Sequence, residues 1–148
     1  PERKTKLYHQ AVELLFDMQT RATRVIDSKC PAYHLKFDLK QLMWEFDFML
    51  DHYVGGLCKS PLESIAKEEV SEVFSPLCEL LAAQKLYFAH RDYHSRNLMV
   101  LDNGGVGILD FQDALIGPIT YDIVSLLSDC YIDWPWARVR QWCAFAYG

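Results

Sequence analysis

Three side chains in one stretch of the sequence have the types and spacing that phosphoryl transfer requires. Asp92 and Asn97 lie five residues apart, and Asp110 follows thirteen residues after Asn97. Phosphoryl transfer depends on a base that orients the acceptor hydroxyl and on charge neutralisation at the transferring phosphate. Magnesium supplies that neutralisation, and it binds hard oxygen ligands, one or two of them from the protein. We therefore interpret Asp92 as the base and Asn97 and Asp110 as metal ligands.

A short hairpin is expected to bring the two metal ligands together. Apolar runs at 98–101 and 106–109 flank the sequence Asp-Asn-Gly-Gly at 102–105, which is typical of a tight turn with positive φ. The second strand of this hairpin delivers Asp110 beside the loop that carries Asn97. Each of the three residues, taken alone, would more often be a turn or capping residue. Their order and the intervening hairpin favour the joint catalytic interpretation.

The sequence leaves the roles of several neighbouring side chains open. His90 is interpreted as a loop residue that holds the backbone rather than as a proton carrier, because Asp92 already has that role. Arg91 and Arg96 either neutralise phosphate or substrate charge or form surface ion pairs. His94 is expected at the substrate edge or in solvent, because magnesium prefers oxygen ligands.

Two further acids lie close by in the sequence. Asp113 is expected to cap a turn rather than to add charge at the metal site. Asp122 follows Thr120 at a predicted helix start, where the helix dipole favours an acid. Its alternative role is to accept hydrogen bonds from the catalytic loop, and both roles can hold at once.

Helical patterns dominate the rest of the chain. Apolar spacing predicts a helix over residues 5–26. The sequence Asp38-x-x-Gln41 resembles a capping box that opens a second helix, which Gly55-Gly56 should end. Ser60-Pro61-Leu62-Glu63 predicts the start of a third helix, reaching about Gln84 and kinked or split at Pro76.

Beyond residue 84 the pattern changes. Residues 86–88 form a strand candidate, Thr120 should cap a helix to about Cys130, and Pro135 should begin a last helix. The sequence thus predicts a mainly helical α+β chain with one small hairpin.

Composition limits the classes of function and partner. The length of 148 residues suits one domain, and a net charge of −5 argues against nucleic-acid and anionic-membrane partners. No signal peptide and no membrane-spanning apolar run is evident. Five scattered cysteines without metal-site spacing indicate reduced thiols and a cytoplasmic protein. Because the chain begins at Pro1 and stops just after an apolar aromatic pattern, we expect both ends to be cut.

Three segments resemble the aminoglycoside phosphotransferase/choline kinase family. They are His90–Met99, Leu109–Ala114 and Gly117–Asp122. The residues around the motif are similar to those of the bacterial cell-wall amino-sugar kinases of that family, which phosphorylate the anomeric hydroxyl of N-acetylmuramate and N-acetylglucosamine. A weaker similarity extends to Phe37-Asp38 and Glu45-Phe46.

This resemblance implies that residues 1–148 are the mainly helical C-lobe of a protein-kinase-like fold that uses ATP and Mg²⁺. It implies that Asp92 is the base, that Asn97 and Asp110 hold magnesium, and that Asp122 and His90 support the loop. Substrate would lie near Asp38 and Glu45, two positions that equally suit a helix cap and a solvated helix residue.

The chain departs from the kinase pattern in two places. Gln112 stands where protein kinases have the glycine of Asp-Phe-Gly, which suits small-molecule kinases better. No glycine-rich phosphate loop and no strand lysine precede the helices, so the N-lobe is expected to be an absent intramolecular partner. We therefore expect weak ATP affinity and negligible turnover from the chain alone.

Other functions remain open at the level of sequence. Aminoglycosides, choline, homoserine and fructosamines are alternative acceptors within the family. The lactyl carboxylate of muramate would favour basic contacts, which Arg91, His94 and Arg96 can supply. A non-catalytic pseudokinase or binding module is disfavoured because Asp92, Asn97 and Asp110 are all present. A metal-dependent hydrolase is disfavoured because His-rich and paired-carboxylate clusters are lacking.

Overall fold

A computed structural model of the chain describes residues 2–60 and 62–147. The chain divides into two compact units. One comprises the residues up to Leu35 together with those from Leu86 onward, and the other runs from Lys36 to Lys85. None of the described helices is long and apolar enough to cross a membrane.

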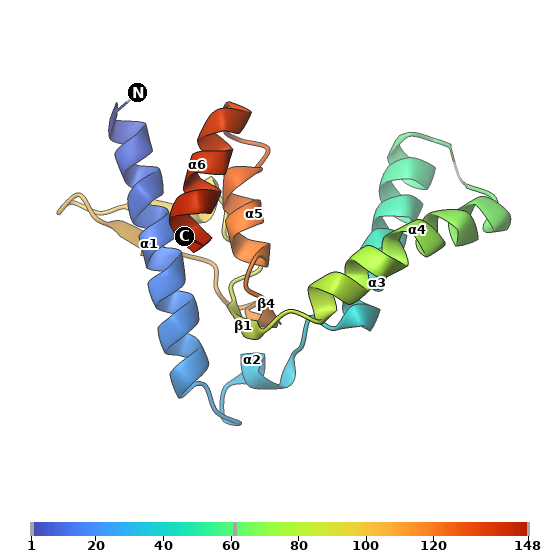
Figure 1. Cartoon of the computed structure of the whole chain (residues 1–148), viewed down its shortest axis with the longest axis horizontal. Coiled ribbons are helices and arrows are strands. Elements are labelled where there is room, and N and C mark those ends of the chain that lie inside the picture. The colour runs from blue at the N-terminus through green and yellow to red at the C-terminus, as the bar shows by residue number, and fades with distance from the viewer. Residues whose placement is uncertain (1, 61, 148) are drawn as a thin grey trace. The chain divides into compact units, whose positions relative to one another are not determined.

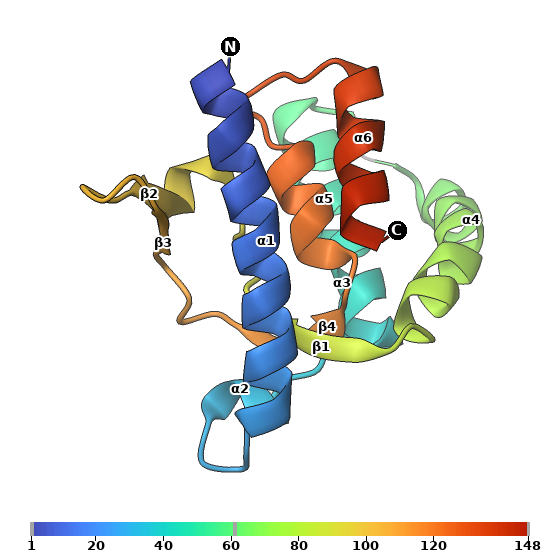
Figure 2. The same ribbon diagram turned by 60° about the vertical axis from the view of Figure 1, so that its left-hand side comes forward.

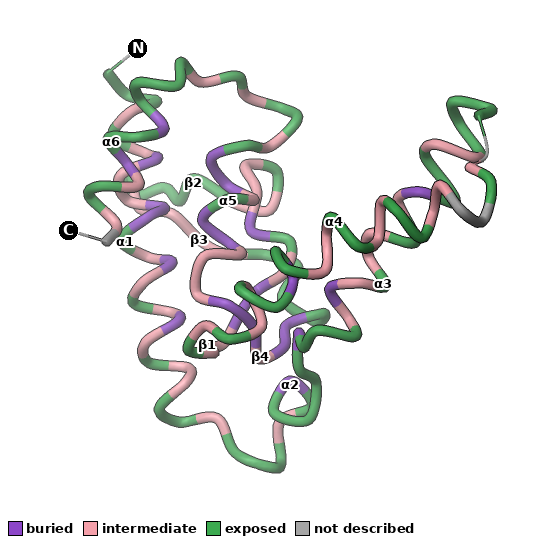
Figure 3. Tube along the Cα trace, turned by 45° about the vertical axis from the view of Figure 1, so that its right-hand side comes forward, coloured by how far each residue is buried: buried purple, intermediate pink, exposed green. Residues whose placement is uncertain are grey.

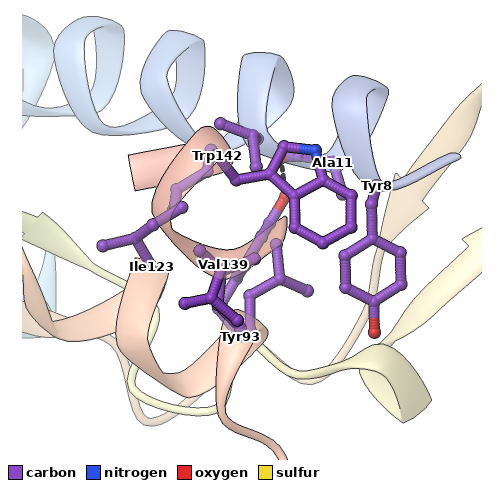
Figure 4. Close-up of a cluster of buried hydrophobic side chains, with 10 residues drawn as sticks. Tyr8, Ala11, Tyr93, Ile123, Val139 and Trp142 are labelled. Atoms are coloured by element: carbon purple, nitrogen blue, oxygen red, sulfur yellow. Dashed lines mark hydrogen bonds between the residues drawn. The ribbon is translucent and has the colours of Figure 1, made fainter. Parts of the chain in front are cut away.

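Three helices of the first unit lie side by side around its apolar core (Figures 1 and 2). They are α1 (Glu2–Val25), α5 (Tyr121–Leu127) and α6 (Trp136–Tyr147). Apolar residues recur along α1 at helical spacing, so one stripe of the helix faces the core. Figure 4 shows the buried cluster, which consists of Tyr8, Ala11, Val12, Leu15, Tyr93, Ile123, Leu126, Leu127, Val139 and Trp142.

Two small antiparallel sheets complete this unit. Strand β1 (Leu86–Ala89) pairs with β4 (Leu115–Pro118), with Ala89 opposite Leu115. Strand β2 (Leu98–Val100) pairs with β3 (Val106–Ile108). Figure 3 shows β4 as largely buried chain. The short helix α2 (Pro31–His34) lies next to β4, and the Ile116 N–H donates to the Leu35 carbonyl oxygen at 2.9 Å.

The second unit is a pair of helical segments. Helix α3 (Leu39–Met49) continues as the π-helical turn η1 (Leu50–Leu57), and α4 (Ser64–Ala82) follows. The rings of Phe46 and Phe74 stack with centroids 3.9 Å apart, which joins α3 to α4.

Most predicted elements are confirmed by the structure. The long first helix, the strand at 86, the hairpin and the last helix after Pro135 all occur. Gly104 takes a φ of 80° in the hairpin turn, a conformation that glycine adopts without strain. Asp38 caps α3 as predicted, since its Oδ1 accepts the Gln41 N–H at 2.9 Å.

Three boundary predictions were wrong. Gly55-Gly56 does not end the second helix, which widens into η1 and stops at Leu57. Helix α4 begins at Ser64 with Glu63 as its N-cap rather than at the Ser60-Pro61 signal, and Pro61 itself lies outside the described residues. Of the two alternatives predicted at Pro76, a kink or a split, the split is excluded because α4 continues through this residue. Helix α5 ends at Leu127, short of Cys130, and Thr120 makes no side-chain capping bond to it.

Strand β4 was not predicted. Its sequence, Leu-Ile-Gly-Pro, is short and ends in two residues that normally signal a turn. It forms because β1, far away in the sequence, offers an edge with which it can pair.

Candidate functional site

The predicted catalytic loop connects β1 to β2, and its backbone is hydrogen-bonded to the buried carboxylate of Asp122. The loop contains the 3₁₀ turn η2 (Ser95–Asn97). Asp122, in the first turn of α5 and fully buried, accepts the His90 N–H on Oδ2 at 2.8 Å. It also accepts the Arg91 N–H on Oδ1 at 3.0 Å. Both oxygens of Asp122 therefore fix the backbone just before Asp92.

The fully buried ring of His90 links the loop to the end of the hairpin. Its Nε2 lies 2.9 Å from the Leu109 carbonyl oxygen, and its Nδ1 lies 3.3 Å from the Asp92 backbone nitrogen. A carbonyl oxygen only accepts and a backbone N–H only donates, so the ring proton is on Nε2 and Nδ1 is the acceptor. His90 thus ties the residue before Asp110 to Asp92.

Asn97 adds a second connection between the same two segments. Its Nδ2 donates to the Asp92 carbonyl oxygen at 2.9 Å, and its own carbonyl accepts the Leu109 N–H at 2.9 Å. Because Nδ2 is engaged there, the amide oxygen Oδ1 is the atom of this side chain suited to a metal ion.

Asp110 follows directly after this connection, with a φ of 65°. Its Oδ1 accepts a hydrogen bond from Gln112 Nε2 at 2.8 Å, which leaves Oδ2 suited to a cation. Arg91 has a φ of 75°. Left-handed backbone at residues other than glycine costs about 1–3 kcal/mol and is concentrated at functional sites. One of these two residues directly precedes the predicted base, and the other is itself a predicted metal ligand.

The donor set fits magnesium. The two proposed ligands offer an amide oxygen and a carboxylate oxygen, which are hard ligands, and Mg²⁺ completes its shell with phosphates and water. Among the residues that the structure describes, no three His, Cys, Asp or Glu side chains converge as a metal cluster.

Burial governs the electrostatics beneath the loop. Burial raises the pKa of the Asp122 carboxyl, against the opposing effect of the hydrogen bonds from the His90 and Arg91 N–H groups. Burial also raises the pKa of the Tyr93 phenol, with the Asp122 charge adding to the effect. The Tyr93 hydroxyl donates to the Ala11 carbonyl oxygen on α1 at 2.7 Å (Figure 4). The residue next to the predicted base is therefore anchored in the core.

Two anchors of the loop were missed by the sequence reasoning. Tyr93 was one, and Gln19 on α1 is the other. Gln19 is buried, donates from Nε2 to the Ile119 carbonyl oxygen at 3.2 Å, and its amide lowers the pKa of Asp122. Its signal in the sequence is a polar residue four positions after Leu15 on the apolar stripe of α1.

Two of the loop side chains predicted to contact substrate, His94 and Arg96, lie against Tyr131. The Arg96 guanidinium lies 4.0 Å from the centre of the Tyr131 ring, and the His94 ring lies 5.3 Å from it. His94 Nδ1 is buried without a hydrogen-bond partner among the described residues. Arg91 is half-buried and is distinguished by its backbone conformation.

Asp38 and Glu45 belong to the second unit. Asp38 is exposed and uses Oδ1 to cap α3, whereas Glu45 is half-buried within that helix. A cavity of about 330 Å³ opens beside the cap. Its lining residues are Lys36, Asp38, Lys40, Gln41 and Trp44.

Comparison with known proteins gives a consistent set of matches. A model described as the phosphotransferase enzyme family matches residues 1–148. An N-acetylmuramate/N-acetylglucosamine kinase of Pseudomonas aeruginosa is 49% identical over 144 residues, which cover 95% of this chain and 39% of that kinase. A protein of the same name from Pseudomonas putida is 35% identical over 139 residues, covering 92% of this chain and 38% of the relative.

A third protein of that name, from Neisseria meningitidis, is 37% identical over 99 residues, covering 67% of this chain and 29% of the relative. The chain thus spans less than two-fifths of the length of these curated relatives.

Proposed function

The chain belongs to the phosphotransferase enzyme family, and we propose that it carries the base and metal ligands of an ATP-dependent amino-sugar kinase. The proposed reaction transfers a phosphoryl group to the anomeric hydroxyl of N-acetylmuramate or N-acetylglucosamine, in the recycling of the cell wall. The shared name of the three relatives supports this choice of acceptor.

The observation that carries the proposal is the hydrogen-bonded frame around three residues. The His90 ring joins Leu109 to the Asp92 backbone, and the Asn97 side chain holds the Asp92 carbonyl. These hydrogen bonds connect the segments that carry the residues proposed as base and metal ligands, which supports the proposal because phosphoryl transfer depends on positioning.

Each residue then has a distinct task. Asp92 is exposed, and in the proposed reaction its carboxylate orients the acceptor hydroxyl and takes its proton. Asn97 and Asp110 would hold Mg²⁺, which when bound neutralises charge on the transferring phosphate. Asp122 and His90 contact the loop backbone and act as positioning residues.

Substrate contacts are proposed at two places. Arg91, His94 and Arg96 supply positive charge or hydrogen-bond donors near the base, which suits the lactyl carboxylate of muramate. Asp38 and Glu45 are proposed for the sugar in the second unit. The cavity beside Asp38 supports the proposal for that residue, because it combines polar side chains with the exposed ring of Trp44.

We further propose that the chain corresponds to the C-lobe of a kinase-like fold and that ATP is bound largely by an N-lobe outside residues 1–148. The relatives are more than twice as long as the matched region. No glycine-rich phosphate loop occurs in the sequence. A cytoplasmic location is proposed because the reaction consumes ATP, and it agrees with the five free cysteines.

The test is an assay of the product of the complete reading frame that contains these residues. Release of ADP should depend on N-acetylmuramate or N-acetylglucosamine and not on choline or kanamycin. Asp92→Asn should lower kcat by about 10²–10⁴-fold, the usual value of a general base, with an unchanged fold. The matched control is Asp102→Asn, an exposed acid in the hairpin turn. Turnover of choline or kanamycin alone would overturn the acceptor, and full activity of the Asp92→Asn variant would overturn the base.

A further inference from the structure

A second acid at the far end of α5 also holds the loop, although the function proposed above gives it no role. Asp129 is half-buried and lies two residues after the helix ends. Its Oδ1 accepts the N–H groups of Tyr131 at 3.0 Å and Ile132 at 2.8 Å. Its Oδ2 accepts the Ser95 N–H at 3.0 Å.

The two carboxylate oxygens do different things. Oδ1 closes a local turn with the residues that follow Asp129, a pattern that one side-chain oxygen completes by itself. Oδ2 reaches a residue 34 positions earlier, at the first position of η2. A local turn does not need this second contact, so it has to be explained by the loop.

The contact reaches Asn97 through only one short turn. Ser95 and Asn97 are the first and last residues of η2, and the Asn97 N–H donates to the His94 carbonyl oxygen at 3.0 Å. Fixing the Ser95 N–H therefore fixes the turn whose last residue provides the amide group that grips the Asp92 carbonyl.

Side-chain packing strengthens the same junction. The Tyr131 ring lies against the Arg96 guanidinium at 4.0 Å and against the His94 ring at 5.3 Å. We call residues 129–132 the clasp. It contacts three consecutive residues of the loop, His94, Ser95 and Arg96, between the proposed base and the proposed metal ligand.

The charge state of Asp129 agrees with this role. Burial acts to raise its pKa, but the hydrogen bonds from the Ser95 hydroxyl and from the N–H groups of Ser95, Ile132 and Tyr131 outweigh it. The pKa of Asp129 therefore lies below its ordinary value. A carboxylate that stays ionised accepts on both oxygens at once.

We propose that Asp129 is a positioning residue that sets the orientation of η2 and thereby of Asn97. Asp122 and Asp129 lie at opposite ends of α5. Asp122 binds the loop backbone just before Asp92, and Asp129 binds it after Asp92. The link to catalysis rests on the function proposed above, in which Asn97 binds Mg²⁺.

The test is Asp129→Asn in the 148-residue chain, studied by NMR. An asparagine has one acceptor oxygen and one NH₂ donor, so it cannot satisfy both sides of the junction. The side-chain oxygen of the asparagine should stay with the N–H groups of Tyr131 and Ile132, because these are two donors. The Ser95 N–H should then face the side-chain NH₂ group and lose its acceptor. Amide exchange at Ser95 should accelerate about tenfold or more, the effect of losing one hydrogen bond to a charged acceptor. The side-chain NH₂ signals of Asn97 should shift at the same time.

Asp133→Asn is the matched control, because it makes the same change at an exposed acid four residues away. Its Ser95 exchange and Asn97 signals should match those of the unchanged chain. Two results would overturn the proposal: unchanged Ser95 exchange in Asp129→Asn, or faster Ser95 exchange with unmoved Asn97 signals.

A parallel titration with Mn²⁺ alone separates this proposal from the proposed function. Broadening of the Asn97 signals in the unchanged chain at lower Mn²⁺ concentrations than in Asp129→Asn would support both. Absence of any Mn²⁺ effect in the unchanged chain would refute Asn97 as a metal ligand, while the Ser95 and Asn97 signals would still decide whether the clasp positions the turn.

Discussion

Replacement of Tyr93 by phenylalanine should weaken the chain by a small and calculable amount. The change removes the hydroxyl of a fully buried side chain, and this hydroxyl donates to the Ala11 carbonyl oxygen. That carbonyl lies within α1 and keeps its helical partner, so no buried acceptor is left unpaired. The expected loss is therefore the net value of one neutral hydrogen bond, about 1 kcal/mol.

Urea unfolding followed by circular dichroism measures this difference. The control is Tyr33→Phe, which removes an exposed hydroxyl and should leave the free energy of unfolding unchanged. Tyr93→Ala removes the ring as well and should cost about 3–5 kcal/mol, as for other large aromatic truncations in a core.

The pH dependence of the free energy of unfolding gives a second test of the Tyr93 hydrogen bond. The folded-state pKa of Tyr93 lies above its ordinary value of 10.0, so the unfolded chain releases the phenol proton first. The stability that the neutral phenol contributes is complete below pH 10.0 and is lost as pH rises towards the folded-state pKa. The difference between the original chain and Tyr93→Phe should therefore shrink above that pH. A Tyr93→Phe variant that is as stable as the original chain at neutral pH would refute the reasoning.

Three substitutions, together with a control at Lys59, test the frame of the site. Asp122→Asn should destabilise the chain by about 2 kcal/mol in urea, because one of two buried N–H groups loses its charged acceptor and faces an NH₂ group; an unchanged midpoint would contradict this. Asp110→Gly should relieve left-handed backbone and raise stability by up to about 1 kcal/mol while abolishing Mn²⁺ binding. Lys59→Gly, with a φ of 52°, should give the same gain with Mn²⁺ binding intact. Asp129→Asn should remove part of the acid unfolding that appears as pH falls below 3.8. The lowered folded-state pKa of Asp129 contributes stability that is complete above 3.8 and is lost as pH falls through the folded-state pKa. Identical acid titrations of the two chains would argue against this.

Local signals in the sequence were sufficient for much of the fold. The hairpin turn at 102–105 and the apolar stripe of α1 depend on neighbours within a few residues, so pattern alone predicts them. Strand β4 depends on an edge provided by β1, and no local pattern reports that edge. The two glycines at 55–56 are a local stop signal, yet the helical chain continues through them as η1 to Leu57.

The candidate site divides in a similar way. Asp92, Asn97 and Asp110 could be named from the sequence because their order and spacing are distinctive. Tyr93 and Asp129 could not, because their partners, Ala11 and Ser95, lie 82 and 34 residues away. Arg96 shows the same limit, since its stacking on Tyr131 depends on a chain reversal that the sequence does not report.

The contacts of Asp122 and Asp129 with the loop backbone have a consequence for which residues of the loop can be substituted. Asp122 and Asp129 hold the loop through the backbone N–H groups of His90, Arg91 and Ser95. Every amino acid except proline offers that group, so these three hydrogen bonds do not require particular side chains, although the Ser95 hydroxyl adds one more bond to Asp129. Substitution at Arg91 and Ser95 can therefore alter the exposed surface of the loop while its backbone keeps these hydrogen bonds. A loop held in this way can vary its side chains without losing the backbone geometry on which the proposed base depends.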